Sequence, residues 1–96
     1  IRMSNRIELV FDNTLTNLAG YEYGKKVYEQ QVQGKIDLNE EFQLVFPKQI
    51  KGVASSFVQG FFEQIVTTIG LLKTEKNATI ISEKDGFSEM IMSKLQ

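Results

Sequence analysis

The sequence contains no histidine and no cysteine, and these two absences remove much of the usual catalytic and metal-binding chemistry. Histidine is the commonest general base and metal ligand in proteins. Cysteine supplies thiolate nucleophiles, zinc ligands and disulfides, and its absence fits a reducing compartment. We therefore expect a cytoplasmic protein that holds no metal and no cofactor.

Long hydrophobic runs and charge of one sign are lacking as well. No apolar stretch approaches the ~20 residues of a membrane-spanning helix, and the beginning of the sequence does not read as a secretory signal. The formal net charge is -1 and the lysines are scattered, so no basic face for nucleic acid is indicated. We expect binding neither to membranes nor to nucleic acid.

The chain is long enough for one domain and too short for two. It has 96 residues, of which 42% are hydrophobic and 24% charged, as in ordinary soluble domains. We expect Met3 to be the natural start and a single domain to occupy residues 3–96.

Strand and helix patterns alternate three times along this domain. Short β-branched and aromatic segments predict strands near residues 6–11, 41–46 and 78–82. Amphipathic periodicity predicts helices near residues 18–32, 56–72 and 86–95. We expect Asn17 and Asp85 to cap the first and last of these helices, and residues 73–77 to form a charged turn.

This alternation is typical of an α/β fold whose strands are mainly parallel and joined by helical crossovers. We expect the first strand to be central, with the second and third strands on either side of it. An N-terminal extension is expected to add an edge strand.

Two glycines, Gly20 and Gly24, fall on the apolar side of the first predicted helix. Glycine within a helix costs up to ~1 kcal/mol relative to alanine, so the pair needs a reason. We expect close packing against a sheet or another backbone, since a phosphate-binding loop would need its glycines before the helix. Tyr23 points away from the apolar stripe, and we interpret it as the rim of the core, with an exposed partner surface as the alternative.

The segment VASSFVQGFF, residues 53–62, places two serines directly before a strongly apolar run. Ser56 is followed three residues later by Gln59, which is the spacing of a capping box at a helix start. The same helix start offers free amides and the positive end of the helix dipole, and these favour a phosphoryl group or another anion. Lys48 and Lys51 in the preceding loop would add positive charge. Both interpretations remain open at this point.

The longer segment LVFPKQIKGVASSFVQGFF, residues 44–62, resembles the signature of STAS domains, the fold of anti-sigma factor antagonists and sulfate transporter tails. In that pattern a strand and a loop lead to a small apolar residue, here Val53, and to a serine pair, here Ser55 and Ser56. Phe57 after the pair is more similar to a STAS-like family of short bacterial and phage proteins of unknown function. The resemblance covers residues 7–95 and implies a small STAS-like sandwich with a regulatory role.

The antagonist domains carry acidic residues that help a partner kinase to phosphorylate a serine. Here Ala54 stands directly before the serine pair, Phe46 and Pro47 stand at the strand end, and Gln49 replaces a loop glycine. Ser56 is the candidate phosphorylation site by resemblance. Because of these replacements, we expect Ser56 to serve first as a helix start, with function using the surface around it.

These patterns favour a binding module over an enzyme. Without a histidine, only Lys48 or Lys51 is left as a base for the serines, and no G-x-S-x-G elbow is present. The expected contact residues are Lys48, Lys51, Ser55, Ser56 and Gln59. By resemblance the partner is a kinase-like ATPase or an anti-sigma-like protein, or else the chain associates with itself. The alternative is a small-molecule, nucleotide or anion site at the same helix start.

Overall fold

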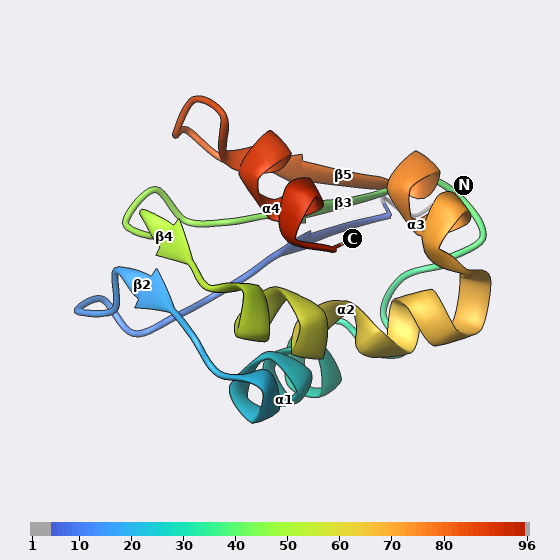
Figure 1. Cartoon of the computed structure of the whole chain (residues 1–96), viewed down its shortest axis with the longest axis horizontal. Helices are drawn as coiled ribbons and strands as arrows, with labels where there is room; N and C mark the ends of the chain where they lie inside the picture. Colours follow the sequence, from blue (N-terminus) through green and yellow to red (C-terminus); the bar gives the residue numbers. More distant parts are fainter. Residues whose placement is uncertain (1–4, 96) are drawn as a thin grey trace.

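The computed structural model describes residues 5–95. Its larger sheet is parallel and consists of β1 (Arg6–Glu8), β3 (Phe42–Val45) and β5 (Ala78–Ile81) (Figure 1). A smaller parallel sheet joins β2 (Asn17–Leu18) to β4 (Gly52–Val53). The expected α/β fold with a mainly parallel sheet is confirmed. Residues 1–4 and 96 lie outside the described part, and so do the ends of the expected domain and the edge strand expected from an N-terminal extension.

The strand order is β1-β3-β5, so the expectation that the first strand is central is wrong. Ile7 of β1 pairs with Leu44 of β3, which occupies the centre of the sheet. Phe42 and Leu44 are completely buried, whereas Arg6 and Glu8 are exposed. Charged side chains of this kind suit an edge strand, and the complete burial of Phe42 and Leu44 suits the centre.

Within residues 5–95, four helices accompany the sheets: α1 (Tyr21–Gln31), α2 (Ser55–Ile69), α3 (Leu71–Asn77) and α4 (Phe87–Leu95). The three helices predicted near residues 18–32, 56–72 and 86–95 are therefore present, but their ends differ. Across residues 5–95, no helix is both long enough and apolar enough to cross a membrane.

The ends differ because residues that are distant in the sequence pair with each other and because glycines interrupt the helices. Asn17 belongs to β2 and is not a helix cap, and Gly20 directly precedes α1. Gly70 has a φ of 87° and separates α2 from α3, so the charged turn expected over residues 73–77 is instead helical. The last helix begins after Gly86 and not after Asp85.

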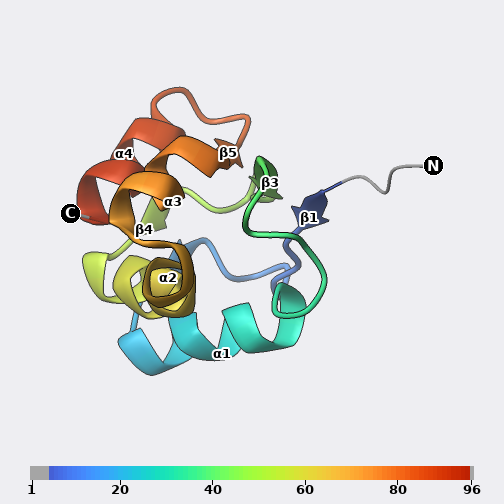
Figure 2. The same ribbon diagram turned by 90° about the vertical axis from the view of Figure 1, so that its right-hand side faces the viewer.

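All four helices lie on one side of the three-stranded sheet, and no helix of the described residues covers the opposite side (Figure 2). The burial along β3 alternates accordingly. Phe42 and Leu44 are buried under the helices, while Gln43 and Val45 on the other face remain partly exposed. The fold is therefore a two-layer structure with one open sheet face.

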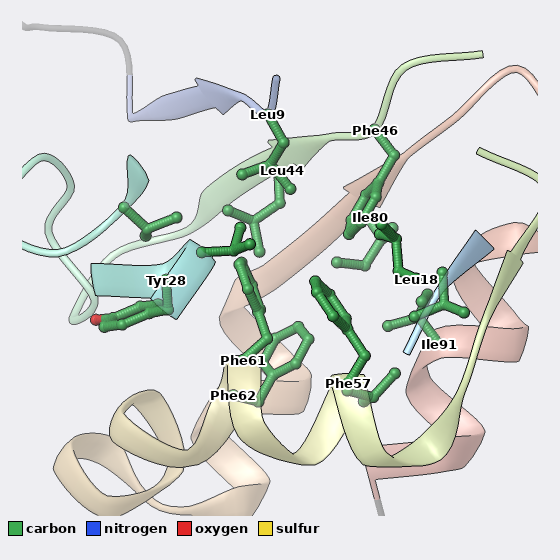
Figure 3. Packing of buried hydrophobic residues seen from close by; sticks show 14 of the residues in the cluster. Leu9, Leu18, Tyr28, Leu44, Phe46, Phe57, Phe61, Phe62, Ile80 and Ile91 are labelled. Atoms are coloured by element: carbon green, nitrogen blue, oxygen red, sulfur yellow. The ribbon is translucent and has the colours of Figure 1, made fainter. Parts of the chain in front are cut away.

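An aromatic cluster fills the space between the sheet and the helices (Figure 3). The ring of Phe61 lies 5.9 Å from that of Phe57 and 5.1 Å from that of Phe62, all three on α2. Tyr28 of α1 meets the Phe61 ring edge-on at 5.8 Å. Burying one such phenylalanine contributes ~1.5–3 kcal/mol, so this face of α2 is a principal anchor of the core.

The helices α1 and α2 approach each other closely at two glycines. A Cβ atom at Gly24 would overlap the main-chain carbonyl of Phe57, and one at Gly60 would overlap the carbonyl of Tyr21. Close packing is therefore confirmed for Gly24, and Gly60 is a second contact of the same kind. For Gly20 the packing interpretation is wrong. This residue precedes α1 with a φ of 101°, a conformation that residues with a Cβ atom rarely adopt.

Candidate binding surface at the start of α2

The small β2–β4 sheet places the beginnings of α1 and α2 side by side (Figure 1). Leu18 pairs with Val53, and each of the two strands leads into its helix within a few residues. The Ala54 amide donates to the Leu18 carbonyl at 2.8 Å, which extends the pairing to the residue before α2. The serine pair is thereby held at a fixed position beside the start of α1.

The loop before β4 is tied to the loop before β2 by Gln49. Its side-chain amide donates to the carbonyls of Asp12 at 2.6 Å and of Leu15 at 3.2 Å. The Asp12 carboxylate itself accepts from the hydroxyl and the amide of Thr14, and these hydrogen bonds lower the pKa of Asp12. Gln49 thus has a structural role, because it joins the two loops.

Ser56 does not form the expected capping box with Gln59. The residue before α2 is Ala54, with an extended backbone (φ -74°, ψ 154°) and no side-chain cap. The Ser56 Oγ atom instead accepts a hydrogen bond from the Gly20 amide at 3.0 Å. Because α2 begins one residue earlier than expected, Ser56 lies within the first turn, and its side chain fastens the start of α1.

Ser55 and Gln59 are brought together on one exposed stripe of α2. They are four residues apart, and Glu63 follows after four more, so the three side chains lie on the same face of the helix. All three residues are exposed. Within residues 5–95 the Ser55 hydroxyl has no hydrogen-bond partner. This stripe, Ser55–Gln59–Glu63, contains two of the predicted site residues, Ser55 and Gln59, and adds Glu63 to them.

The predicted lysines are exposed but do not join the stripe by any hydrogen bond or ion pair within the described residues. Lys48 lies in the loop after β3 and Lys51 directly precedes β4. One lysine contact beside the start of α2 was not suggested by the sequence. The Lys94 Nζ atom of α4 donates to the Val53 carbonyl at 2.5 Å, two residues before α2 begins. No local pattern marks this contact, because the two residues are 41 positions apart.

A groove of about 280 Å³ runs beside the stripe, with a floor that is largely apolar. Its lining residues are Tyr21, Gln59, Phe62, Glu63, Val66, Thr67 and Leu95. The Tyr21 hydroxyl donates a hydrogen bond to the Glu63 carboxylate across this groove. That hydrogen bond raises the pKa of the Tyr21 phenol, because the neutral phenol is the donor.

The tyrosines of α1 contribute differently from what the helical wheel indicates. Tyr23 was expected to point away from the apolar stripe, but its ring lies 5.6 Å from the ring of Phe57. Tyr21 and Tyr23 are each 38% exposed, so both cover the core and also reach the surface. Tyr23 therefore lies beside the first turn of α2, and Tyr21 reaches Glu63 farther along the same helix.

Neither hydroxyl of the serine pair contacts a base in the described part of the chain. The Ser56 oxygen contacts a main-chain amide, which cannot accept a proton, and among residues 5–95 no base contacts Ser55. Within the same residues, no cluster of acidic side chains has the composition of a metal site. The site offers hydrogen-bonding groups, partly exposed aromatic rings and a shallow apolar floor.

Comparisons with protein-family models, with curated proteins and with solved structures find no match for this chain. The STAS-like resemblance therefore rests on the serine segment and stays a prediction.

Proposed function

We propose that the chain is a non-enzymatic, regulatory protein-binding module of STAS-like type that contacts its partner through the start of α2. The observation that carries the proposal is the exposed stripe of Ser55, Gln59 and Glu63 beside the groove. The stripe stands on a rigid base, since the opposite face of α2 is buried in the aromatic core. A rigid surface loses little entropy on binding.

The composition of this surface suits a protein partner. Protein interfaces combine an apolar centre with a polar rim and are enriched in tyrosine. Phe62, Val66 and Leu95 form the apolar floor of the groove, and Gln59 and Tyr21 stand at its sides. A kinase-like ATPase or an anti-sigma-like protein is the partner that the STAS-like resemblance implies.

The same surface supports recognition that does not depend on phosphorylation of Ser56. The Ser56 hydroxyl is already engaged with the Gly20 amide, and a phosphate there would crowd the start of α1. Ser55 is also exposed, and its hydroxyl has no hydrogen-bond partner within the described residues. We therefore assign the contact to the surface and treat modification of Ser56 as secondary.

The experiment is affinity capture with three matched baits. Gln59→Arg places a long charged side chain in the proposed surface, and Gln33→Arg makes the same change at an exposed position after α1. The proposal is supported if wild type and Gln33→Arg capture the same protein and Gln59→Arg does not. The captured protein must also bind the purified chain in calorimetry. Equal retention by all three baits contradicts it.

A second candidate function is the binding of a small anion or nucleotide at the start of α2. Ala54 provides no side-chain cap, so the first amides of α2 have no side-chain acceptor and could bind an anion. The positive charge of Lys94, which contacts the Val53 carbonyl, lies nearby. Thermal unfolding with nucleotides and phosphate esters tests it. A rise in melting temperature that Lys94→Met removes would favour this candidate over a protein partner.

A further inference from the structure

A separate feature of the fold is the outer edge of β1, which lies farthest from β5 in the sheet (Figure 2). Within residues 5–95, β1 pairs only with β3. The Gln43 amide donates to the Asn5 carbonyl and the Leu9 amide donates to the Val45 carbonyl, both at 2.9 Å. Because successive residues of a strand direct their main-chain groups to opposite sides, the amides and carbonyls of Arg6 and Glu8 point away from β3.

The next outward-facing residue, Val10, is already occupied. Its amide donates to Gln31 Oε1 and its carbonyl accepts from Gln31 Nε2, both at 2.8 Å. The Gln31 side chain thus replaces a neighbouring strand at this point. Among residues 5–95, the open part of the edge is confined to Arg6, Ile7 and Glu8.

The side chains on this open edge have opposite charges in a symmetric arrangement. The Arg6 guanidinium lies 3.7 Å from the Glu8 carboxylate, and the two side chains are 41% and 73% exposed. Charged residues at a sheet edge usually prevent pairing with another chain. A positive and a negative residue placed evenly about Ile7 favour the antiparallel register centred on Ile7 and oppose the registers in which like charges meet.

We propose that a second copy of this chain pairs with β1 in the antiparallel direction, with the two-fold axis passing beside Ile7. This register sets Arg6 of each copy opposite Glu8 of the other, and the outward main-chain groups of these two residues then meet as a hydrogen-bonded pair. A shift of two residues in either direction sets Arg6 against Arg6 or Glu8 against Glu8. Main-chain direction and side-chain charge therefore select the same register.

The proposed pairing joins the two three-stranded sheets into one and keeps the helices of both copies on the same face. The strand has only three residues, whereas stable complexes bury ~1,200–2,000 Å² in total. The dimer is accordingly weak and depends on protein concentration and on salt. It does not rest on the proposed function, because β1 is distinct from the start of α2.

The pairing is tested by measuring the dimer dissociation constant of the full chain in sedimentation equilibrium over a range of concentrations. The measurement is repeated with variants in which a charge of β1 is reversed. Arg6→Glu and Glu8→Arg each set like charges opposite one another, so each should weaken association by at least about tenfold. The double variant Arg6→Glu/Glu8→Arg should restore it. Lys84→Glu changes the net charge as Arg6→Glu does, at an exposed loop position, and should have no effect.

Mixing the two single variants keeps the test decisive even if one of them is less stable alone. In the mixture one copy presents two carboxylates and the other two guanidinium groups, so a mixed dimer should form where neither variant associates by itself. A wild-type chain that stays at the mass of one copy up to about 1 mM would overturn the proposal. Association that is the same in all variants would overturn it as well, because it would use another surface.

Discussion

The Ser56 hydroxyl oxygen lies 3.0 Å from the Gly20 amide nitrogen and accepts its hydrogen bond. The contact joins the first turn of α2 to the residue directly before α1, 36 positions earlier in the chain. Ser56 therefore fixes the starts of α1 and α2 relative to each other, beside the proposed binding surface. The neighbouring Ser55 forms no such hydrogen bond within the described residues.

The two serines should differ in their effect on stability. Ser56→Ala removes the acceptor for the Gly20 amide and should lower the free energy of unfolding by about 1 kcal/mol. Ser55→Ala should change it by less than about 0.5 kcal/mol, because the side chain is exposed and unpaired within the described residues. Urea denaturation of both variants measures the difference. Equal losses would show that the hydrogen bond to Gly20 contributes nothing.

The contact between α1 and α2 should not tolerate a methyl group. Gly24→Ala and Gly60→Ala should each destabilise the protein by ~1–3 kcal/mol, because the added carbon overlaps main-chain atoms that cannot move independently. Helix propensity acts in the opposite direction by up to ~1 kcal/mol. Lys26→Ala, at an exposed position of α1, is the control and should be nearly neutral. A stabilised glycine variant would show that the helices are farther apart.

The hydrogen bond from Tyr21 to Glu63 should be visible in the titration of tyrosine. It raises the pKa of Tyr21 above the ordinary value of 10.0, so the stability that it adds is present below pH 10.0 and is lost as the pH rises through the higher folded pKa. Glu63→Gln should lower the pKa of Tyr21. Ultraviolet absorbance of tyrosinate follows this change, and Tyr21→Phe identifies the signal against Tyr23 and Tyr28. An unchanged titration curve in Glu63→Gln would contradict the contact.

The Gln31 side chain should protect the main chain at Val10. Gln31→Leu removes both hydrogen bonds and should lower the free energy of unfolding by about 1–2 kcal/mol. Hydrogen exchange of the Val10 amide, followed by NMR, should become faster in the variant. Gln33→Leu, two residues later and exposed, serves as the control. Slow exchange at Val10 in both variants would mean that another group covers this amide.

Local patterns were sufficient to predict most of the elements. The β-branched and aromatic segments around Val45 and Ile80 are strands, and the apolar periodicity from Phe57 to Ile69 is a buried helix face. Gly24 was recognisable because a glycine inside an amphipathic helix needs a close neighbour. These features depend on residues that are near one another in the chain.

The features that sequence reasoning missed depend on distant residues. The position of β3 at the centre and the two-residue pairing of Asn17 and Leu18 are decided by which segments meet. Ser56 has the spacing of a capping residue, yet Gly20 decides what its hydroxyl does. Lys94 reaches Val53 from the last helix, and no local pattern marks either residue for that contact.

The most direct test of the proposed binding role is site-specific photo-crosslinking in the organism that makes the protein. A photoreactive phenylalanine analogue at Gln59 would lie in the proposed surface, and the same analogue at Gln33 would lie outside it. The proposal predicts one discrete adduct with another protein from position 59 and none from position 33. No adduct from position 59, or the same adducts from both positions, would contradict a protein contact at the start of α2.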